Sequence, residues 1–139
     1  DRSKLKEVLV LTEKKSNKNQ EDLAIIQNSK NKLVSLGGQS VSPTSYAKIY
    51  WNTETQAVYV DASGLPKPPE GMVYQVWSLK LKPTLTPTSI GFLADFDQQS
   101  NKIFEVSDTY SADAFGITLE PAGGSTGPTM EQLYTLGKV

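Results

Sequence analysis

Apolar residues recur at helical spacing near the start of the chain and then thin out. Leu5 and Leu9 are four residues apart, which places them on one face of a helix. Eleven consecutive polar residues separate Leu11 from Leu23, so such a helix would lack a continuous apolar face. We therefore predict a solvated helical stalk over residues 1–31, whose sparse apolar residues would allow at most a weak homodimer contact.

Beyond the stalk, short apolar runs alternate with Gly, Pro, Asn and Asp, a pattern typical of an all-β domain. Because no helical pattern separates the runs, an antiparallel arrangement is favoured over a parallel sheet. We predict a domain over residues 32–139, an antiparallel β-sandwich of about seven to eight strands of Ig-like or Greek-key type. The expected strands are Lys32–Leu36, Tyr46–Trp51, Ala57–Ala62, Val73–Leu79, Ser89–Asp95, Lys102–Val106, Ala114–Glu120 and Leu133–Gly137.

Three local patterns refine this prediction. The segment Asn52–Thr55 reads as the turn of a hairpin. The stretch SGLPKPPEG, residues 63–71, is too rich in proline to join a sheet ladder and is expected to be a connection. The stretch MVYQVWSL, residues 72–79, is apolar at both alternating sets of positions, so it should be a central strand that is buried on both faces.

Composition narrows the chemistry more than it narrows the fold. The 139 residues suit a single domain, and 37% of them are hydrophobic. The chain has no Cys and no His, which excludes Cys/His zinc sites, cysteine nucleophiles and Ser-His-Asp triads. A formal net charge of −1 gives no general attraction to nucleic acid. We expect a protein that is not an enzyme, with no cofactor, no metal and no nucleic-acid partner.

The stretch LEPAGGSTGPT, Leu119–Thr129, has the most unusual composition in the chain. It is not a phosphate-binding loop, because no Lys accompanies its glycines and a strand is expected to follow it. Ser125 has no base except a carboxylate and lies outside a nucleophile-elbow motif. The residues favour an ordered hairpin loop in which Glu120 accepts hydrogen bonds from backbone N–H groups of the loop.

Two other sets of side chains are candidates for a site. Asp95 with Asp97, and Asp108 with Asp113, pair carboxylates at short spacing, but neither pair has the loop of a calcium site, and turn formation explains them better. Aromatic residues in the expected strands would form a sugar-stacking platform if they were exposed together, whereas their alternation favours burial. These aromatic residues are Trp51, Tyr59, Tyr74, Trp77 and Phe92.

The order of four motifs resembles the C-terminal extracytoplasmic domain of anti-sigma-K-type factors. The motifs are a Leu-Pro-x-x-Pro connection, a Tyr-Gln-x-Trp strand, a Gly-aromatic strand and a final Thr-x-Glu-Pro-x-Gly-Gly-Ser loop that ends in Pro-Thr. The resemblance extends from about Leu33 to the C-terminus. The matching residues are Leu65, Pro66 and Pro69; Tyr74, Gln75 and Trp77; Gly91 and Phe92; and Thr118, Glu120, Pro121, Gly123, Gly124, Ser125, Pro128 and Thr129.

The resemblance implies a single-pass bacterial membrane protein. In that family a cytoplasmic domain holds an extracytoplasmic-function sigma factor away from RNA polymerase, and cleavage by a site-1-type protease outside the membrane starts its release. Since this chain has no His, no Cys and no apolar run of about 20 residues, we expect it to be the outer, periplasmic domain alone. The residues themselves leave as an alternative a carbohydrate- or peptide-binding module that uses the aromatic set and the Glu120 loop as a pocket. A third interpretation, a carboxylate-dependent hydrolase, is less favoured because no acid/base pair can be assigned at a suitable spacing.

Overall fold

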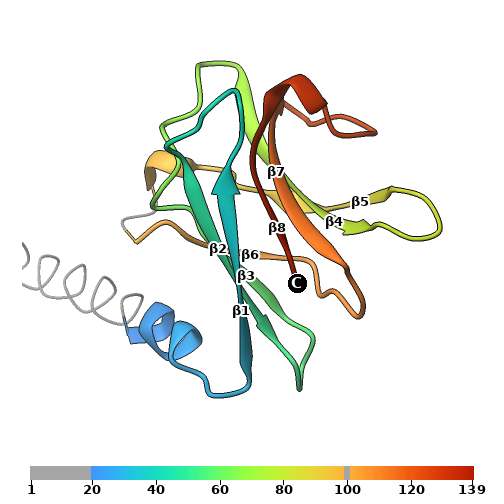
Figure 1. Cartoon of the computed structure of the whole chain (residues 1–139). Helices are drawn as coiled ribbons and strands as arrows, with labels where there is room; N and C mark the ends of the chain where they lie inside the picture. The colour runs from blue at the N-terminus through green and yellow to red at the C-terminus, as the bar shows by residue number, and fades with distance from the viewer. Residues whose placement is uncertain (1–19, 99–100) are drawn as a thin grey trace, which may run out of the picture.

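The structure, a computed structural model, describes residues 20–98 and 101–139. Its eight strands form one antiparallel sheet in the order β5-β4-β7-β8-β1-β2-β3-β6, and Figure 1 shows this sheet curling round on itself. Two short 3₁₀ helices, η1 and η2, precede β6 and β8. The bounds are β1 Asn31–Gly38, β2 Tyr46–Asn52, β3 Val58–Asp61, β4 Met72–Lys80, β5 Thr86–Phe92, η1 Phe96–Gln98, β6 Ile103–Val106, β7 Ala114–Pro121, η2 Met130–Gln132 and β8 Leu133–Lys138.

The prediction of an all-β antiparallel domain is confirmed, but the division into two stacked sheets is not. The two halves of the sheet are joined at a short seam, where Gly37 and Gly38 of β1 pair with β8. A side chain at Gly137 would bring its Cβ within 2.1 Å of the Ser35 carbonyl oxygen, so glycine is what allows β1 and β8 to approach. Across the remaining gap, the Ser107 amide donates to the Ile90 carbonyl at 2.7 Å, which makes the sheet a nearly closed barrel.

Strands are found at all eight of the expected places. The expected turn at Asn52 is also present, with its side-chain oxygen accepting hydrogen bonds from two amides of the turn, each at 2.9 Å. One strand is displaced, because β5 covers Thr86–Phe92 rather than Ser89–Asp95. Asp95 has a φ of 53°, a left-handed conformation that ends an extended segment. Pro87 is tolerated earlier in β5 because β5 lies at the edge of the sheet.

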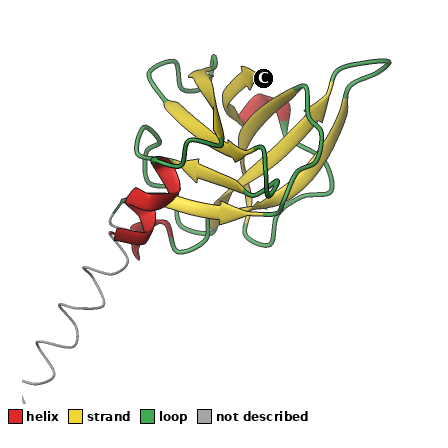
Figure 2. Cartoon of the chain, turned by 90° about the horizontal axis from the view of Figure 1, so that it is seen from below, coloured by secondary structure: helices red, strands yellow, loops and turns green. Residues whose placement is uncertain are grey.

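Only the last part of the expected stalk lies within the described residues. Residues 1–19, where the stalk and its dimer contact were expected, lie outside them. Residues 20–26 are helical and lie beside the barrel wall (Figure 2). Asp22 of this helix is buried and accepts a hydrogen bond from the Asn101 side chain at 3.1 Å. The chain therefore enters the barrel next to the start of β6.

The core occupies the interior of the barrel, and a smaller apolar cluster lies on the outer face of the same sheet. The interior cluster contains residues from strands β1 to β7, among them Phe115 and Ile117 of β7. The outer cluster consists of Trp77, Leu79 and Ala114, with Leu136 packed against it. Because β4 contributes to both clusters, its side chains are buried on both faces, as its sequence predicted.

Candidate functional site

Glu120 lies at the centre of the most conspicuous polar cluster in the protein. Its side chain is fully buried, and four donors surround its two oxygens. The Thr118 hydroxyl donates to Oε2 at 2.6 Å and the Ser125 hydroxyl to Oε1 at 2.8 Å. Thr129 donates twice, through its amide to Oε2 at 2.9 Å and through its hydroxyl to Oε1 at 2.6 Å. Three of these donors are hydroxyls, whereas the sequence suggested backbone amides.

The charge of Glu120 is sustained by hydrogen bonds rather than by a cation. Burial by itself raises the pKa of a carboxyl group, but the bonds from Thr118, Thr129 and Ser125 outweigh it and hold the pKa of Glu120 below its usual range. Among the described residues, no ion pair involves this carboxylate. Glu120 is therefore an ionised acceptor that ties the loop to the strand before it.

The network continues from Glu120 into β4. Thr118 accepts a hydrogen bond from the indole Nε1 of Trp77 at 2.9 Å while it donates to Glu120. Gln75 binds the same loop from the other side, since its carbonyl oxygen accepts the Ser125 amide at 2.9 Å. The Gln75 amide group donates to the Ser125 carbonyl at 3.2 Å and to the Ser89 hydroxyl at 2.7 Å. Three strands (β4, β5 and β7) and one loop are thus held by a continuous set of directed bonds.

The glycine pair of the loop has a geometric role. Gly124 has a φ of 80°, and a Cβ there would lie 2.3 Å from the ring of Phe92. Both the left-handed backbone and the ring above it require a residue without a side chain. Gly123 also has a positive φ, of 93°. Phe92 of β5 and Gly124 of the loop, which belong to separate motifs in the sequence, therefore lie side by side.

The Leu-Pro connection is attached to the barrel through Tyr74. The phenol of Tyr74 donates to the Pro66 carbonyl at 2.7 Å, and Leu65 is buried in the interior core. Burial, with a smaller contribution from Tyr134, raises the pKa of Tyr74. The phenol therefore remains a neutral hydrogen-bond donor at ordinary pH.

The remaining residues of the motifs lie around these contacts. Pro121 is the last residue of β7, and Pro128 lines an apolar groove on the outer face of the sheet. Gly91 has a φ of 149°, and a Cβ there would lie 3.0 Å from the Val106 side chain, next to the point where β5 and β6 approach. Pro69 accepts the Met72 amide through its carbonyl at 3.0 Å. The structure thus brings the second, third and fourth motifs together, and the first contacts the second through the bond from Tyr74 to Pro66.

The other sequence candidates do not form a site. Trp51, Tyr74 and Trp77 are buried, and only Phe92 of the aromatic set is markedly exposed, so these rings present no shared stacking surface. Within residues 20–98 and 101–139, no group of three Asp, Glu, His or Cys side chains is placed to hold a metal ion. In the same ranges, no helix is long and apolar enough to cross a membrane.

Comparison with known proteins agrees with this arrangement. Residues 5–133 match the family described as "Anti-sigma-K factor rskA, C-terminal". The chain belongs to this family. It is also 37% identical, over 79 residues, to "Uncharacterized protein in phr 5'region" of Streptomyces griseus, and the matched stretch covers 57% of this chain and 31% of that protein. No solved structure matches the chain. The resemblance seen in the motifs is therefore confirmed at the level of the family.

Sequence reasoning missed two features of the site. Ser89, the second partner of Gln75, carries no motif signal and only becomes a partner because β5 pairs with β4. The apolar groove over Trp77 was also missed. Its sequence signal was the run of apolar residues on the second face of β4, which was interpreted only as burial.

Proposed function

We propose that this chain is the non-catalytic outer domain of a single-pass membrane anti-sigma factor. In this proposal the domain lies on the extracytoplasmic side of the bacterial inner membrane, and residues 1–31 form its juxtamembrane stalk. A cytoplasmic domain outside this chain would bind an extracytoplasmic-function sigma factor. Family membership supports the regulatory class, while the topology, the sigma factor and the protease are parts of the proposal.

The observation that carries the proposal is that the polar residues of the family motifs make their hydrogen bonds within the domain itself. Thr118 donates to Glu120, and Gln75 bonds to the backbone of Ser125 in the loop and to Ser89 of β5. Glu120 is fully buried. A catalytic or ligand-binding polar group needs access to its substrate. Residues arranged in this way instead keep the barrel folded, so the quantity that we propose to be regulated is the folded state of the domain.

The contacts where the chain enters the barrel suggest how unfolding of the barrel would be signalled. Asp22, in the helical turn before β1, is buried beside Asn101. Thr53 binds the Lys30 carbonyl through both its amide and its hydroxyl, each at 2.9 Å. An intact barrel therefore holds the end of the stalk against its wall. We propose that loss of this attachment exposes the stalk to a site-1-type protease, whose cut leads to release of the sigma factor.

Limited proteolysis tests the gating part of the proposal. A protease of broad specificity should cut the wild-type chain first within residues 12–22 and leave residues 33–139 intact. It should make this first cut faster in Glu120→Ala, whose less stable barrel releases the stalk more often, as mass spectrometry of the fragments over time would show. Backbone in a packed sheet is inaccessible without local unfolding. Early cuts inside residues 33–139 would contradict the proposal.

A reporter gene driven by the sigma factor tests the regulatory part in the full-length protein. Glu120→Ala should raise reporter output, because a less stable barrel exposes the stalk more often. Glu131→Ala, a matched change at an exposed glutamate of η2, should leave output unchanged. Deleting the protease should abolish the rise. Proteolytic gating would be overturned if Glu120→Ala left the reporter output unchanged, or if the output still rose after the protease was deleted.

A further inference from the structure

An apolar groove of about 200 Å³ lies on the outer face of the sheet, separate from the interior core. Its floor is formed by β4, β7 and β8, with Trp77, Gly116 and Leu136 among its residues. Leu85 of the β4–β5 hairpin and Met130 of η2 line its sides, and these two side chains are 53% and 54% exposed. Exposed apolar side chains that gather around a concave floor are typical of a binding surface.

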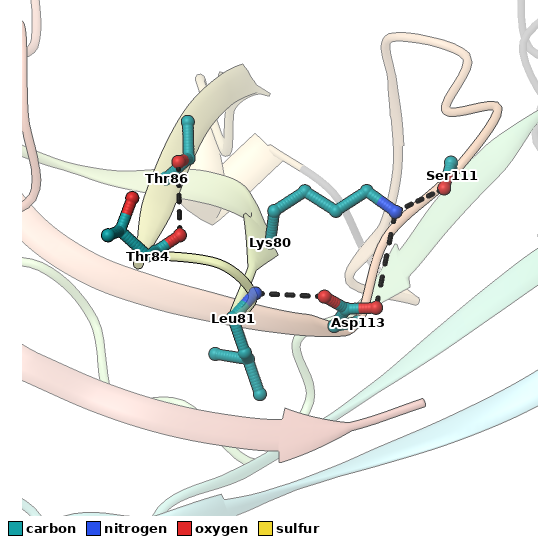
Figure 3. A network of polar contacts seen from close by, with 6 residues as sticks. All are labelled: Lys80, Leu81, Thr84, Thr86, Ser111 and Asp113. Atoms are coloured by element: carbon teal, nitrogen blue, oxygen red, sulfur yellow. Dashed lines mark hydrogen bonds and ion pairs between the residues drawn. The ribbon is translucent and has the colours of Figure 1, made fainter.

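The groove is preformed, because hydrogen bonds fix the segments on both sides of it. On one side, Glu120 holds Thr129, the residue before Met130. On the other side, the Asp113 carboxylate accepts the Leu81 amide at 2.8 Å and lies 4.0 Å from the ammonium group of Lys80 (Figure 3). Lys80 also donates to the Ser111 hydroxyl. The base of the β4–β5 hairpin is thereby tied to the start of β7.

The groove offers almost nothing to a polar ligand. The backbone groups of β4 and β7 are used within the sheet, because each of these strands is paired with a neighbour on both sides. The one hydroxyl in its lining, that of Thr118, is already bonded to Trp77 and Glu120. A bound peptide would leave its own N–H and C=O groups without partners, which is costly. A hydrocarbon chain has no such groups to satisfy.

One end of the groove is basic. Lys138 is the only charged residue in its lining. The adjoining cleft shares Leu81 with the groove and adds two lysines, Lys80 and Lys82, and one carboxylate, that of Asp113. Within the described residues, Lys80 is engaged by Asp113, whereas neither Lys82 nor Lys138 makes an ion pair. An anionic group at the end of a hydrocarbon chain would find two available ammonium groups here.

We propose that this groove binds a single-chain anionic amphiphile, a free fatty acid, with its chain over Trp77 and its carboxylate near Lys138 and Lys82. The helical turn of residues 20–26 and the β4–β5 hairpin lie on opposite sides of the barrel (Figure 1). If the stalk leads to the bilayer, a choice that rests on the proposed function, the groove is remote from the membrane. A free amphiphile is therefore the better occupant than a lipid within the bilayer.

Calorimetric titration of the 139-residue chain with laurate, below its micelle concentration, tests the proposal. We expect saturable binding of one laurate per chain and a change in tryptophan fluorescence, because Trp77 lines the groove. Octanoate should bind more weakly, since each methylene group that leaves water adds affinity. Laurylamine, with the same chain and a positive charge, should bind much more weakly than laurate.

Matched variants locate the site. Leu85→Ser should weaken laurate binding by roughly five- to tenfold, whereas Leu33→Ser, at a leucine of the same 53% exposure on β1, should not. Lys138→Gln should weaken binding, and Lys48→Gln, at an exposed lysine of β2, should not. Gly116→Ala should also weaken binding, because the added methyl group takes up space at the floor of the groove. The fold should tolerate it, since the methyl group makes only ordinary contacts of 3.4–3.6 Å with the protein.

Several outcomes would overturn the proposal. The first is that laurate does not bind saturably, and the second is that Leu85→Ser and Leu33→Ser weaken binding equally. The third is that an aliphatic peptide binds but laurate does not. The fourth is that the chain binds anionic vesicles but not free laurate. Melting curves of each variant show whether it is folded. Since these measurements involve neither the sigma factor nor the protease, their failure is distinguishable from failure of the proposed function.

Discussion

The two faces of β7 are stabilised in different ways. On the inner face, Phe115 and Ile117 pack in the apolar core, where stability depends on volume and shape and similar residues can substitute for one another. On the outer face, Thr118 and Glu120 act through directed hydrogen bonds, where each donor and acceptor must be a particular group. This difference explains why the polar residues in the second half of β7 identify the family motif, whereas the apolar residues of β7 indicate only that the segment is a strand.

Removing a large side chain from the inner face should have the greatest effect. Phe115→Ala is expected to lower the free energy of unfolding by about 3–5 kcal/mol, because Phe115 is fully buried and packs edge-on against Trp51, with ring centroids 5.4 Å apart. Urea denaturation followed by circular dichroism measures it. Tyr110→Ala, at a residue that is 79% exposed, is the control and should be nearly neutral. A nearly neutral Phe115→Ala would show that the inner face is not closely packed.

On the outer face, Glu120→Ala should lower the free energy of unfolding by about 1–3 kcal/mol, because four donors lose a charged acceptor. Glu120→Gln keeps one carbonyl oxygen and should cost less. The same denaturation experiment applies, with Glu131→Ala as the exposed control. If Glu120→Ala were as stable as the wild type, the hydrogen-bond network would not stabilise the loop. The proposed difference between the two faces of β7 would then be wrong.

Two buried threonines provide a sharper test with a single substitution. Thr118→Val should cost about 1 kcal/mol, because it leaves the Trp77 N–H without its acceptor and removes a donor to Glu120. Thr135 is equally buried, but its hydroxyl has no partner within the described residues. Thr135→Val should therefore be neutral or stabilising. Equal costs for the two substitutions, measured by thermal and urea denaturation, would contradict the assignment of directed bonding to the outer face.

The last prediction concerns pH. Because the pKa of Glu120 is lower in the folded protein than its ordinary value of 4.5, the stability linked to its charge is fully present above that value. It is lost as the pH falls through the folded pKa. The difference in unfolding free energy between the wild type and Glu120→Gln should therefore narrow as the pH is lowered from neutral to below 4.5. A constant difference would show that the network does not favour the ionised form.

The sequence located the strands well because the signals are local. Alternation of apolar and polar residues, and turn residues such as Asn52, depend on a few neighbouring positions. The early end of β5 goes with a local feature that the pattern hid, the left-handed conformation of Asp95 in the turn that follows. For the loop, composition identified Glu120 as a hydrogen-bond acceptor. It did not identify the donors, because the hydroxyl of Ser125 reaches the carboxylate only once the loop folds back over the sheet.

By itself, the sequence determined the all-β class, the approximate places of the strands, the burial of β4 on both faces and, through its motifs, the family. Tertiary structure decided that the strands form one nearly closed sheet rather than two, since the pairing of Gly37 with Leu136 joins segments far apart in the chain. It also decided that Gln75 meets Ser125, fifty residues away, and that an apolar groove lies over Trp77. Periodicity and turn chemistry are properties of neighbouring residues, whereas pairing, networks and grooves depend on which distant surfaces meet when the core closes.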